Sequence, residues 1–209
     1  MISVKKCIFV VMFLGLSGCG LFYPVSLDEM LSPPETVPLP ETTYSVKEVR
    51  VSVPETLVVS EDSVYYRTAD IVWRGEPYGD RHQQVGEIFK DGMTRALRAL
   101  NGPREIYVDV EVTRFHALTN KARYTVGGVH SIKFILTLRD VETDLVIGEP
   151  RLIKADLIAL GGARALAAEQ RGLSQKRRIN SHLAGVIQRE VITEKTDQEV
   201  AALSGFALN

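Results

Sequence analysis

Cysteine is scarce in this sequence, which has only Cys7 and Cys19 among its 209 residues. Two cysteines are too few for the disulfide framework that holds many small secreted domains together. A chain of this length is nevertheless long enough to form one domain around a substantial hydrophobic core. We therefore expect core packing, rather than covalent cross-links, to stabilise the fold.

The common signatures of catalysis are also missing. There is no serine nucleophile in a Gly-x-Ser-x-Gly turn, no His-Glu-x-x-His motif, no phosphate-binding loop and no metal site built from paired cysteines. The 25 basic and 26 acidic residues nearly cancel, so nothing indicates a nucleic-acid partner. An enzymatic function is unsupported, and we expect no catalytic residue and no metal ligand.

Only four histidines are present, and no two of them have the close spacing that metal sites often use. His116 and His130 flank one loop and would meet across a hairpin, where a metal or acid–base role is one interpretation. The alternative is that these histidines lie on the surface or anchor loops, and we favour that alternative.

The N-terminus has the layout of an export signal. Lys5 and Lys6 precede an apolar run from Ile8 to Leu16, which ends at the small residues Ser17 and Gly18. The run is much shorter than the ~20 residues that a helix needs to cross a bilayer. We therefore expect residues 1–18 to be a signal peptide that is cleaved, rather than a permanent membrane span.

The sequence Leu16-Ser17-Gly18-Cys19 resembles the lipobox of bacterial lipoproteins. This resemblance implies that the Cys19 thiol receives a diacylglycerol, that the chain is cut before Cys19 and that the new amine is acylated. The alternative is an ordinary signal peptide followed by a chance cysteine. A lipidated Cys19 leaves no disulfide, because Cys7 is lost with the signal, and covalent lipid is the only non-protein group we expect.

Several acyl chains on Cys19 would hold the protein stably on a membrane, since each buried methylene contributes about 0.8 kcal/mol. In enteric lipoproteins an aspartate after the lipidated cysteine favours the inner membrane, and this chain has Gly20 there. The resemblance therefore implies the inner leaflet of the outer membrane, facing the periplasm.

Residues 19–43 have the composition of a tether. They carry no sustained apolar pattern and contain five prolines, Pro24, Pro33, Pro34, Pro38 and Pro40. Extended at ~3.1 Å per residue, such a linker would reach up to roughly 70 Å. A spacer is our interpretation, and a proline-rich docking peptide is the alternative.

A folded domain is predicted over residues 44–194. Val49, Val51 and Val53 alternate with polar residues, as in a half-buried strand, and residues 57–59 and 69–73 are short β-prone runs. A helix should then begin after Asp80 as N-cap and end before Asn101-Gly102-Pro103. Its apolar stripe consists of Val85, Ile88, Phe89, Met93, Ala96, Leu97 and Leu100.

Three further strands and a second long helix follow. Alternation predicts strands over 106–112, 132–138 and 152–160, and the alanine-rich segment 163–170 leads into the helix. The apolar positions of that helix are Ile179, Leu183, Val186, Ile187 and Val191. Residues 195–209 are expected to be a polar tail. This order predicts an α+β domain, with an antiparallel or mixed sheet of about four to five strands and both long helices on one face.

Three segments carry a resemblance to a known family. They are Ala69-Asp70-Ile71-Val72-Trp73-Arg74-Gly75-Glu76-Pro77-Tyr78-Gly79-Asp80-Arg81, Ala122-Arg123-Tyr124-Thr125-Val126-Gly127-Gly128 and Ala155-Asp156-Leu157. Together they resemble an uncharacterised family of small alphaproteobacterial lipoproteins, which implies no activity. The order of elements is also similar to that of auxiliary lipoproteins of envelope lipid-transport systems and of the lipoprotein domain of curli-secretion channels.

Two candidate contact sites precede the last helix. Trp73 is either an exposed anchor for a partner or, as we favour, a core residue at a strand end. The segment 117–129 is longer than a hairpin needs, and its Arg123 and Tyr124 are candidates for contact with a partner or an anionic glycan. In the alternative interpretation, residues 124–126 merely extend the following strand through a glycine bulge.

A basic cluster surrounds the start of the last helix. We use this name for Arg171, Lys176, Arg177 and Arg178. Such a cluster is suited to lipid headgroups or lipopolysaccharide phosphates, and cations near a helix N-terminus are unfavourable for the helix dipole. A solvated charged face is the alternative, and helical spacing would split the cluster.

Three functional hypotheses follow. The first is a non-enzymatic accessory or scaffold module that acts with other envelope proteins. The second is a periplasmic lipoprotein that binds a lipid or glycan between sheet and helix. An enzyme of unrecognised type is the third. A filled core with an exposed aromatic patch would favour the first, an apolar cavity under a helix the second, and a cleft joining His116, His130 and carboxylates the third.

Overall fold

The structure is a computed structural model that describes residues 43–65 and 68–206, with side chains described as far as Ile192. The predicted signal peptide, Cys19 and the tether lie outside these residues. The strands are β1 (Tyr44–Ser52), β2 (Ile71–Val72), β3 (Arg104–His116), β4 (Gly128–Asp140), β5 (Val146–Lys154) and β6 (Leu157–Ala159). The helices are α2 (Arg81–Leu97), α3 (Asn120–Arg123), α4 (Gly162–Gln170) and α5 (Gln175–Phe206).

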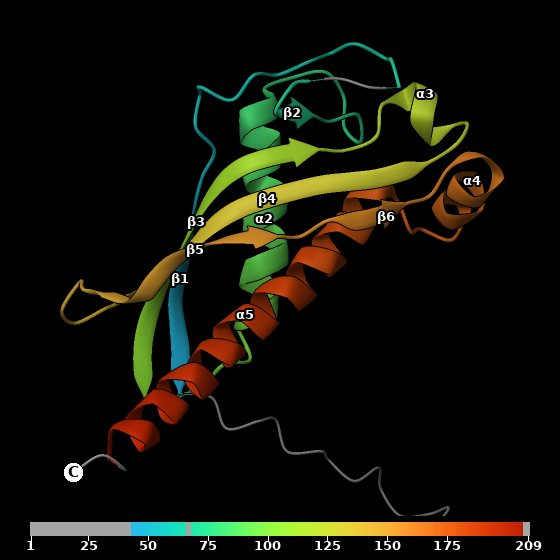
Figure 1. The fold of residues 1–209 in the computed structure, drawn as a ribbon. Coiled ribbons are helices and arrows are strands. Elements are labelled where there is room, and N and C mark those ends of the chain that lie inside the picture. The colour runs from blue at the N-terminus through green and yellow to red at the C-terminus, as the bar shows by residue number, and fades with distance from the viewer. Residues whose placement is uncertain (1–42, 66–67, 207–209) are drawn as a thin grey trace, which may run out of the picture. The chain divides into compact units, whose positions relative to one another are not determined.

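These strands form one mixed sheet in the order β1-β3-β4-β5 (Figure 1). β1 runs parallel to β3, because α2 lies between them and carries the chain back across the sheet. β3, β4 and β5 are antiparallel neighbours. The short strands complete the two edges, with β2 beside the end of β3 and β6 beside the start of β4. The predicted α+β class is confirmed.

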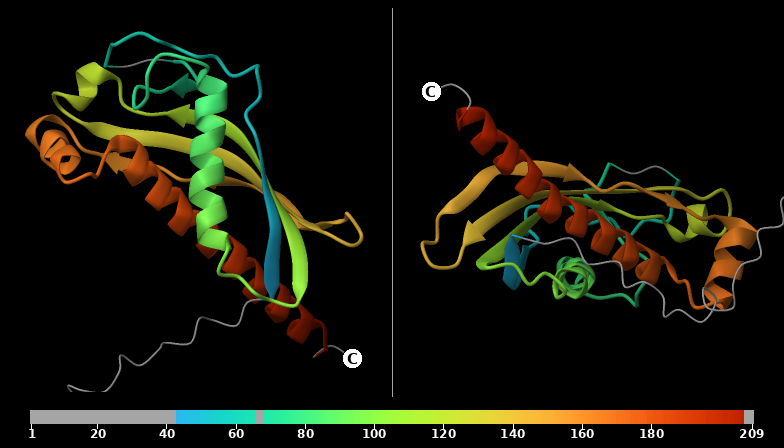
Figure 2. Two further views of the ribbon diagram at one scale, coloured as in Figure 1. Left: turned by 180° about the vertical axis from the view of Figure 1, so that it is seen from behind. Right: turned by 90° about the horizontal axis from the view of Figure 1, so that it is seen from below.

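Both long helices cover the same face of the sheet and cross one another there (Figure 2). The alternating apolar residues of the strands predicted over 106–112 and 132–138 are buried, with exposures of 0–2%; they are Ile106, Val108, Val110, Val112, Ile132, Phe134, Leu136 and Leu138. Phe89 of α2 packs edge-on against Phe134, at 5.6 Å between ring centroids, and also contacts Phe115. The described space between sheet and helices is therefore a packed core.

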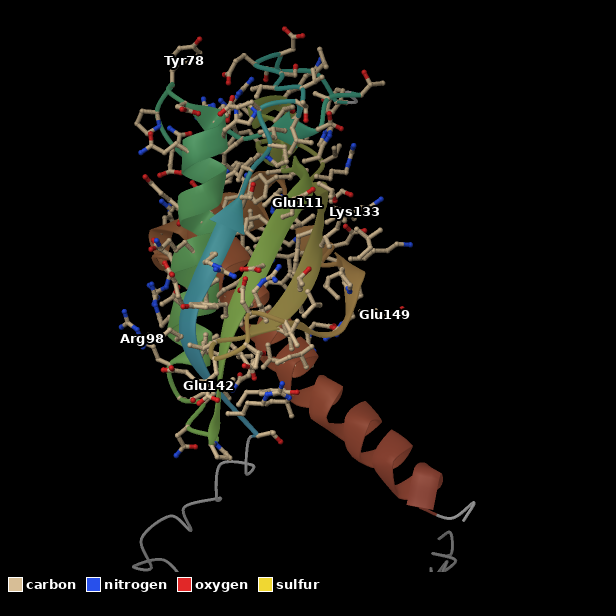
Figure 3. The ribbon with its side chains drawn as sticks, turned by 90° about the vertical axis from the view of Figure 1, so that its left-hand side faces the viewer. Tyr78, Arg98, Glu111, Lys133, Glu142 and Glu149 are labelled. Carbon is tan, nitrogen blue, oxygen red and sulfur yellow. The ribbon has the colours of Figure 1, made fainter. Side chains whose placement is uncertain are left out.

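The opposite face of the sheet is open and carries charged side chains, as Glu111 of β3 and Lys133 of β4 show in Figure 3. On this face, Arg50 makes a two-pronged ion pair with Asp109 of the neighbouring strand, at 2.6 and 2.9 Å. The pairing raises the pKa of the Arg50 guanidinium. This face is thus hydrated rather than a second core.

The sequence located α2 accurately. The Asp80 side chain accepts the Gln83 N–H at 3.0 Å, as an N-cap should. The predicted stripe is buried except for Ala96, which is half-buried. The charged residues between the stripe positions are exposed; they are Lys90, Asp91, Arg95 and Arg98. The apolar positions predicted for α5 are all buried as well.

Three boundaries differ from the predictions. The expected strand over 152–160 is two strands, because the chain breaks at Ala155-Asp156, where the Asp156 carboxylate accepts the Ile132 N–H at 3.0 Å. Residues 124–126 do not extend β4 but form a turn after α3. Helix α5 continues to Phe206, so the expected polar tail is largely helical. None of the helices in the described ranges is long and apolar enough to cross a bilayer.

Candidate functional site

The segment between β3 and β4 is an ordered structure at the end of the sheet opposite Tyr44 (Figure 1). Thr119 caps α3 by accepting the Ala122 N–H at 3.3 Å, and its own hydroxyl donates to the Val64 carbonyl at 2.9 Å. The Gly127 N–H donates to the Ala122 carbonyl at 2.8 Å and closes the turn. These bonds hold the predicted contact segment in one conformation.

Two glycine pairs bring this segment against the start of α4. Gly127 has φ +76° and Gly162 has φ +54°, values that side chains disfavour. A Cβ on Gly161 would lie 2.0 Å from the Gly127 nitrogen, so neither backbone would tolerate a side chain at that approach. The glycine pair of the second family-like segment therefore has a structural role, because it allows this close backbone packing.

A groove of about 320 Å³ opens beside α3. Its walls include Tyr65, Leu118, Val126 and Val129, and Arg114 and His116 supply its polar groups. None of the residues that line it is acidic. The Nδ1 atom of His116 lies 3.0 Å from Arg114 and 3.2 Å from the Ala69 carbonyl, and burial lowers the His116 pKa.

Exposed apolar side chains gather around this groove. We call the set of Tyr65, Tyr124, Val126, Val129 and Ile158 the α3-end surface. Their exposures run from 42% for Tyr65 to 74% for Ile158. Val129 and Ile158 are direct cross-strand neighbours in the β4–β6 pair. Clustered apolar exposure of this kind is typical of interaction surfaces.

The two candidate residues of the segment have different environments. Tyr124 is half exposed, at 51%, and belongs to the α3-end surface. The Arg123 side chain is instead only 11% exposed, and its guanidinium forms an ion pair with Glu169 of α4. Arg123 therefore joins α3 to α4 inside the domain and is not presented to a partner.

Trp73 is fully buried, which rules out an exposed anchor and agrees with the core alternative. Its ring packs edge-on against Phe115 at 5.6 Å, and its indole N–H donates to the Glu76 carboxylate at 2.9 Å. A Cβ on Gly75 would lie 2.2 Å from the ring, so the glycine makes room for the indole. The first family-like segment is thus a structural motif.

Two arginines of the same segment are nearly buried and share one carboxylate from outside it. Glu61 binds both Arg74 and Arg81, at 2.6 and 2.8 Å, and the side chains of these arginines are only 9% and 4% exposed. The hydrogen bond from Arg81 is the main cause of the lowered pKa of Glu61. This network could not be predicted, since Glu61 lies in a polar stretch without any recognisable pattern.

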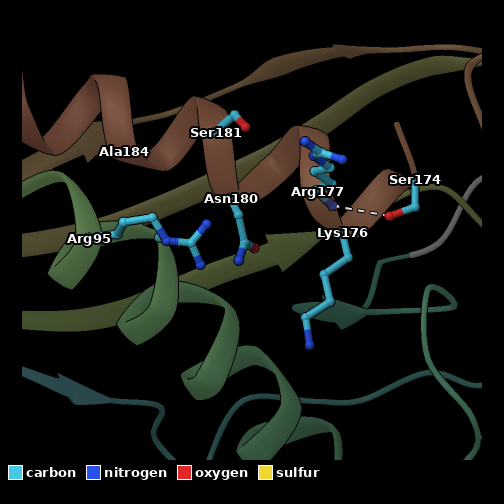
Figure 4. Close-up of a pocket in the computed structure, with 8 residues that line it drawn as sticks. Arg95, Ser174, Lys176, Arg177, Asn180, Ser181 and Ala184 are labelled. Carbon is cyan, nitrogen blue, oxygen red and sulfur yellow. Dashed lines mark hydrogen bonds between the residues drawn. The ribbon is translucent and has the colours of Figure 1, made fainter. Parts of the chain in front are cut away.

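The basic cluster is divided by the structure. Lys176 donates to Glu76 at 2.7 Å, and Arg178 points to the other side of α5, where it donates to the Ile158 carbonyl at 2.9 Å. Arg171 and Arg177 are exposed. Arg177 and Lys176 line a groove of about 480 Å³ between α2 and α5, together with Arg95 (Figure 4). The four cations therefore do not form one common surface.

The histidines do not form a common site either. His116 is opposite Ser131 in the β3–β4 register, so His116 and His130 point to opposite faces of the sheet. His130 is buried, at 1% exposure, which contradicts a surface position. Within residues 43–65 and 68–206, no group of three or more potential ligands could hold a metal ion.

A small polar pocket that the sequence did not reveal lies beneath α4. His130 and Gln175 are both buried around it, and each has a nitrogen without a hydrogen-bond partner among the described residues. These residues are 45 positions apart in the sequence, and neither belongs to a recognised motif.

Comparisons with solved structures found distant likenesses. Protein XCC0632 from Xanthomonas campestris, of the DUF330 family, has a TM-score of 0.46 and 13% identity, over 79% of this chain and 92% of that one. A “putative lipoprotein” from Caulobacter crescentus has a TM-score of 0.34 and 15% identity, over 71% of this chain and 91% of that one. No curated protein sequence matches.

The comparison with family models is more informative. The matched region, residues 44–205, begins with the first residue of β1 and includes nearly all of α5, so it contains the whole α+β domain. It also includes all three of the family-like segments identified above. The chain belongs to the DUF6778 family, a family of unknown function.

Proposed function

We propose that this protein is a lipid-anchored envelope lipoprotein and acts as a non-enzymatic accessory or scaffold module for another envelope protein. The anchor is the lipidated Cys19 on the outer membrane, and the domain faces the periplasm. The observation that carries the proposal is the α3-end surface, where exposed tyrosine, valine and isoleucine side chains surround a groove of about 320 Å³.

The position of this surface suits a tethered protein. The tether would enter the domain at Tyr44, where β1 pairs with the beginning of β3. The α3-end surface lies beyond the far end of β3, a strand of 13 residues that spans about 40 Å at ~3.3 Å per residue. The α3-end surface therefore lies at the other end of the sheet from the residue at which the tether joins the domain.

The apolar area and the charges of the α3-end surface indicate the kind of partner that it would bind. Arg114 lies in the groove, and Lys121 is exposed beside it with its ammonium 4.6 Å from the centre of the Tyr65 ring. We expect a protein surface with an apolar centre and carboxylates at its rim, since such a partner would complement both the apolar area and the cations.

The packed core supports this proposal over a lipid- or glycan-binding protein. That second hypothesis places the ligand between sheet and helices, where the described side chains of the core are at most 7% exposed. The enzyme hypothesis called for a cleft that joins His116 and His130. These two residues lie on opposite faces of the sheet and cannot line one cleft together.

A photo-crosslinking amino acid in living cells tests the partner contact. We expect position 126 to give one discrete protein adduct and position 145 to give none, because Val126 and Leu145 are similarly exposed, at 73% and 68%, but only Val126 belongs to the α3-end surface. A Val129→Lys substitution should abolish the adduct without unfolding the domain. Equal adducts at both positions, or adducts with lipid alone, would contradict the proposal.

Metabolic labelling with a fatty-acid analogue tests the anchor. Wild-type protein should carry the label and fractionate with membranes, whereas Cys19→Ser should remain unlabelled and keep its signal peptide. Label on the Cys19→Ser protein would show that the lipid is attached elsewhere. The adduct at position 126 should also disappear in this variant if the tether brings the surface to its partner.

A further inference from the structure

Three cations form a row across the open face of the sheet. Arg114 of β3 lies directly opposite Lys133 of β4, and Lys133 lies directly opposite Lys154 of β5. Residues opposite each other on antiparallel strands extend their side chains from the same face of the sheet. We call these three residues the cation row. Because neighbouring strands are about 4.8 Å apart, the row spans about 10 Å.

This arrangement has an electrostatic cost, since like charges directly opposite one another destabilise a sheet. Among the residues that the structure describes, no member of the row forms an ion pair, and Arg114 instead lies 3.0 Å from the Nδ1 atom of the His116 ring. Other cations of the same face are paired, because Arg50 and Arg139 both bind Asp109. The repulsion within the cation row is therefore not offset by the described part of the domain.

The cation row is accessible and adjoins the α3-end surface. Arg114 and Lys133 are partly exposed, and Lys154 is exposed. Arg114 also lines the groove beside α3, and β5 is the last strand in the sheet order. The row thus begins in that groove and ends at the edge of the sheet, so one partner could contact the row and the α3-end surface together.

The other charges of this face limit the extent of an anionic partner. Glu111 shares the face with Lys133, as Figure 3 shows, and lies opposite Ile135 in the next row of outward-facing residues. The Asp109 carboxylate lies further along β3. An anionic bilayer would bring its phosphates against these carboxylates as well as the cations, whereas a short acidic segment would meet the row alone. Charge complementarity therefore favours a protein segment over a membrane surface.

We propose that the cation row binds an acidic segment of the protein partner that contacts the α3-end surface. Apolar side chains of that partner would enter the groove, and adjacent carboxylates would pair with Arg114, Lys133 and Lys154. This inference rests on the proposed accessory function and specifies the chemistry of its partner. The bound carboxylates would also remove the repulsion that the row has in the free domain.

Charge reversal at the end of the row separates binding from folding. Lys154→Glu places a carboxylate opposite Lys133, so the urea midpoint of the full-length protein should rise. The same substitution repels an acidic partner, so the yield of the crosslinked adduct at position 126 should fall. Lys90→Glu makes the same charge change at an exposed lysine of α2 and should leave the adduct unchanged. A fall of both midpoint and adduct in Lys154→Glu would indicate a structural role and overturn the proposal.

A labelled oligoglutamate peptide tests the row without the partner. Fluorescence anisotropy is measured with the full-length protein in nonionic detergent at low salt. We expect saturable binding that weakens with added salt. Lys154→Glu should weaken it roughly two- to fivefold, as expected for the loss of one exposed ion pair, and Lys90→Glu should not. Phosphatidylglycerol added to the micelles should not displace the peptide; displacement would assign the row to lipid headgroups and overturn the proposal.

The two measurements distinguish this inference from the function on which it rests. If the wild-type protein gives no adduct at position 126, the accessory function is contradicted, and the peptide still reports on the cation row. If Lys154→Glu and Lys90→Glu have equal effects on the adduct or on peptide affinity, the cation row is not the binding site, and the accessory function remains supported by the adduct.

Discussion

Gly75 provides a direct test of the packing around Trp73. A Cβ at this position would lie 2.2, 2.4 and 2.9 Å from three carbons of the indole ring. Ordinary contacts between carbon atoms are about 3.5–4.0 Å, so the shortest approach is too close by at least ~1.3 Å. The ring has little freedom to move, since it packs against Phe115 and donates to Glu76, which in turn binds Lys176.

The expected cost of Gly75→Ala follows from these contacts. Forcing an extra methyl group into a packed core typically costs about 1–3 kcal/mol of stability. Alanine also makes the unfolded chain less flexible than glycine does, which offsets about 0.4–1 kcal/mol of this cost. We expect a net loss of about 2 kcal/mol in the free energy of unfolding. Urea denaturation of the full chain in detergent, followed by far-ultraviolet circular dichroism, measures it.

A double-mutant cycle identifies the cause. Trp73→Phe removes the six-membered ring that the new methyl group would strike, so Gly75→Ala should cost less than about 0.5 kcal/mol in that background. The same full cost with tryptophan and with phenylalanine would show that the strain lies elsewhere. A Gly75→Ala protein as stable as the wild type would refute the packing argument altogether.

Three further predictions concern stability and use urea midpoints. Leu97→Ala should lower the free energy of unfolding by about 2–5 kcal/mol, because residue 97 is 1% exposed. Arg98→Ala should change it little. Small effects at both positions would mean that the α2 stripe is not buried. Lys176→Gln should destabilise the protein, since the Nζ atom of Lys176 is 2.7 Å from the Glu76 carboxylate. Arg177→Gln should not. Equal effects of the two substitutions would argue against the ion pair between Lys176 and Glu76. The free energy of unfolding should fall by roughly 3 kcal/mol as the pH is lowered from about 6.5 to about 4. The pKa of His130 is depressed in the folded protein, so the unfolded chain binds this proton first, and a flat profile would contradict the depressed pKa.

The fold could be predicted wherever burial follows a regular period. Val108 and Phe134 were placed correctly because alternate residues of a strand share one face, and Phe89 because residues three and four apart share one face of a helix. The break at Ala155-Asp156 escaped prediction, since the apolar alternation continues across it from Ile153 to Ala159. At the break, the Ala155 N–H donates to the Ile132 carbonyl and the Asp156 carboxylate accepts the Ile132 N–H, contacts that apolar alternation does not reveal.

The candidate site was predicted less well, because its contacts join residues that are distant in the sequence. Tyr124 was named as a candidate because of the length of its loop, whereas Val129 and Ile158 become neighbours only through the β4–β6 pairing. Arg123 was expected to be free because its partner, Glu169, lies 46 residues away. A local pattern does not show which charges will pair over such separations.

The parallel pairing of β1 with β3 has a consequence for biosynthesis. Tyr44 pairs with Arg104, so about 60 residues must be synthesised after β1 before its partner strand exists. At about 5–20 residues per second, the ribosome needs roughly 3–12 s for that interval. During this time β1 is a strand with unpaired backbone groups on both edges, and unpaired strand edges are prone to aggregate. Lys47, Glu48 and Arg50 are interspersed with its valines, and their charges oppose self-association until β3 emerges.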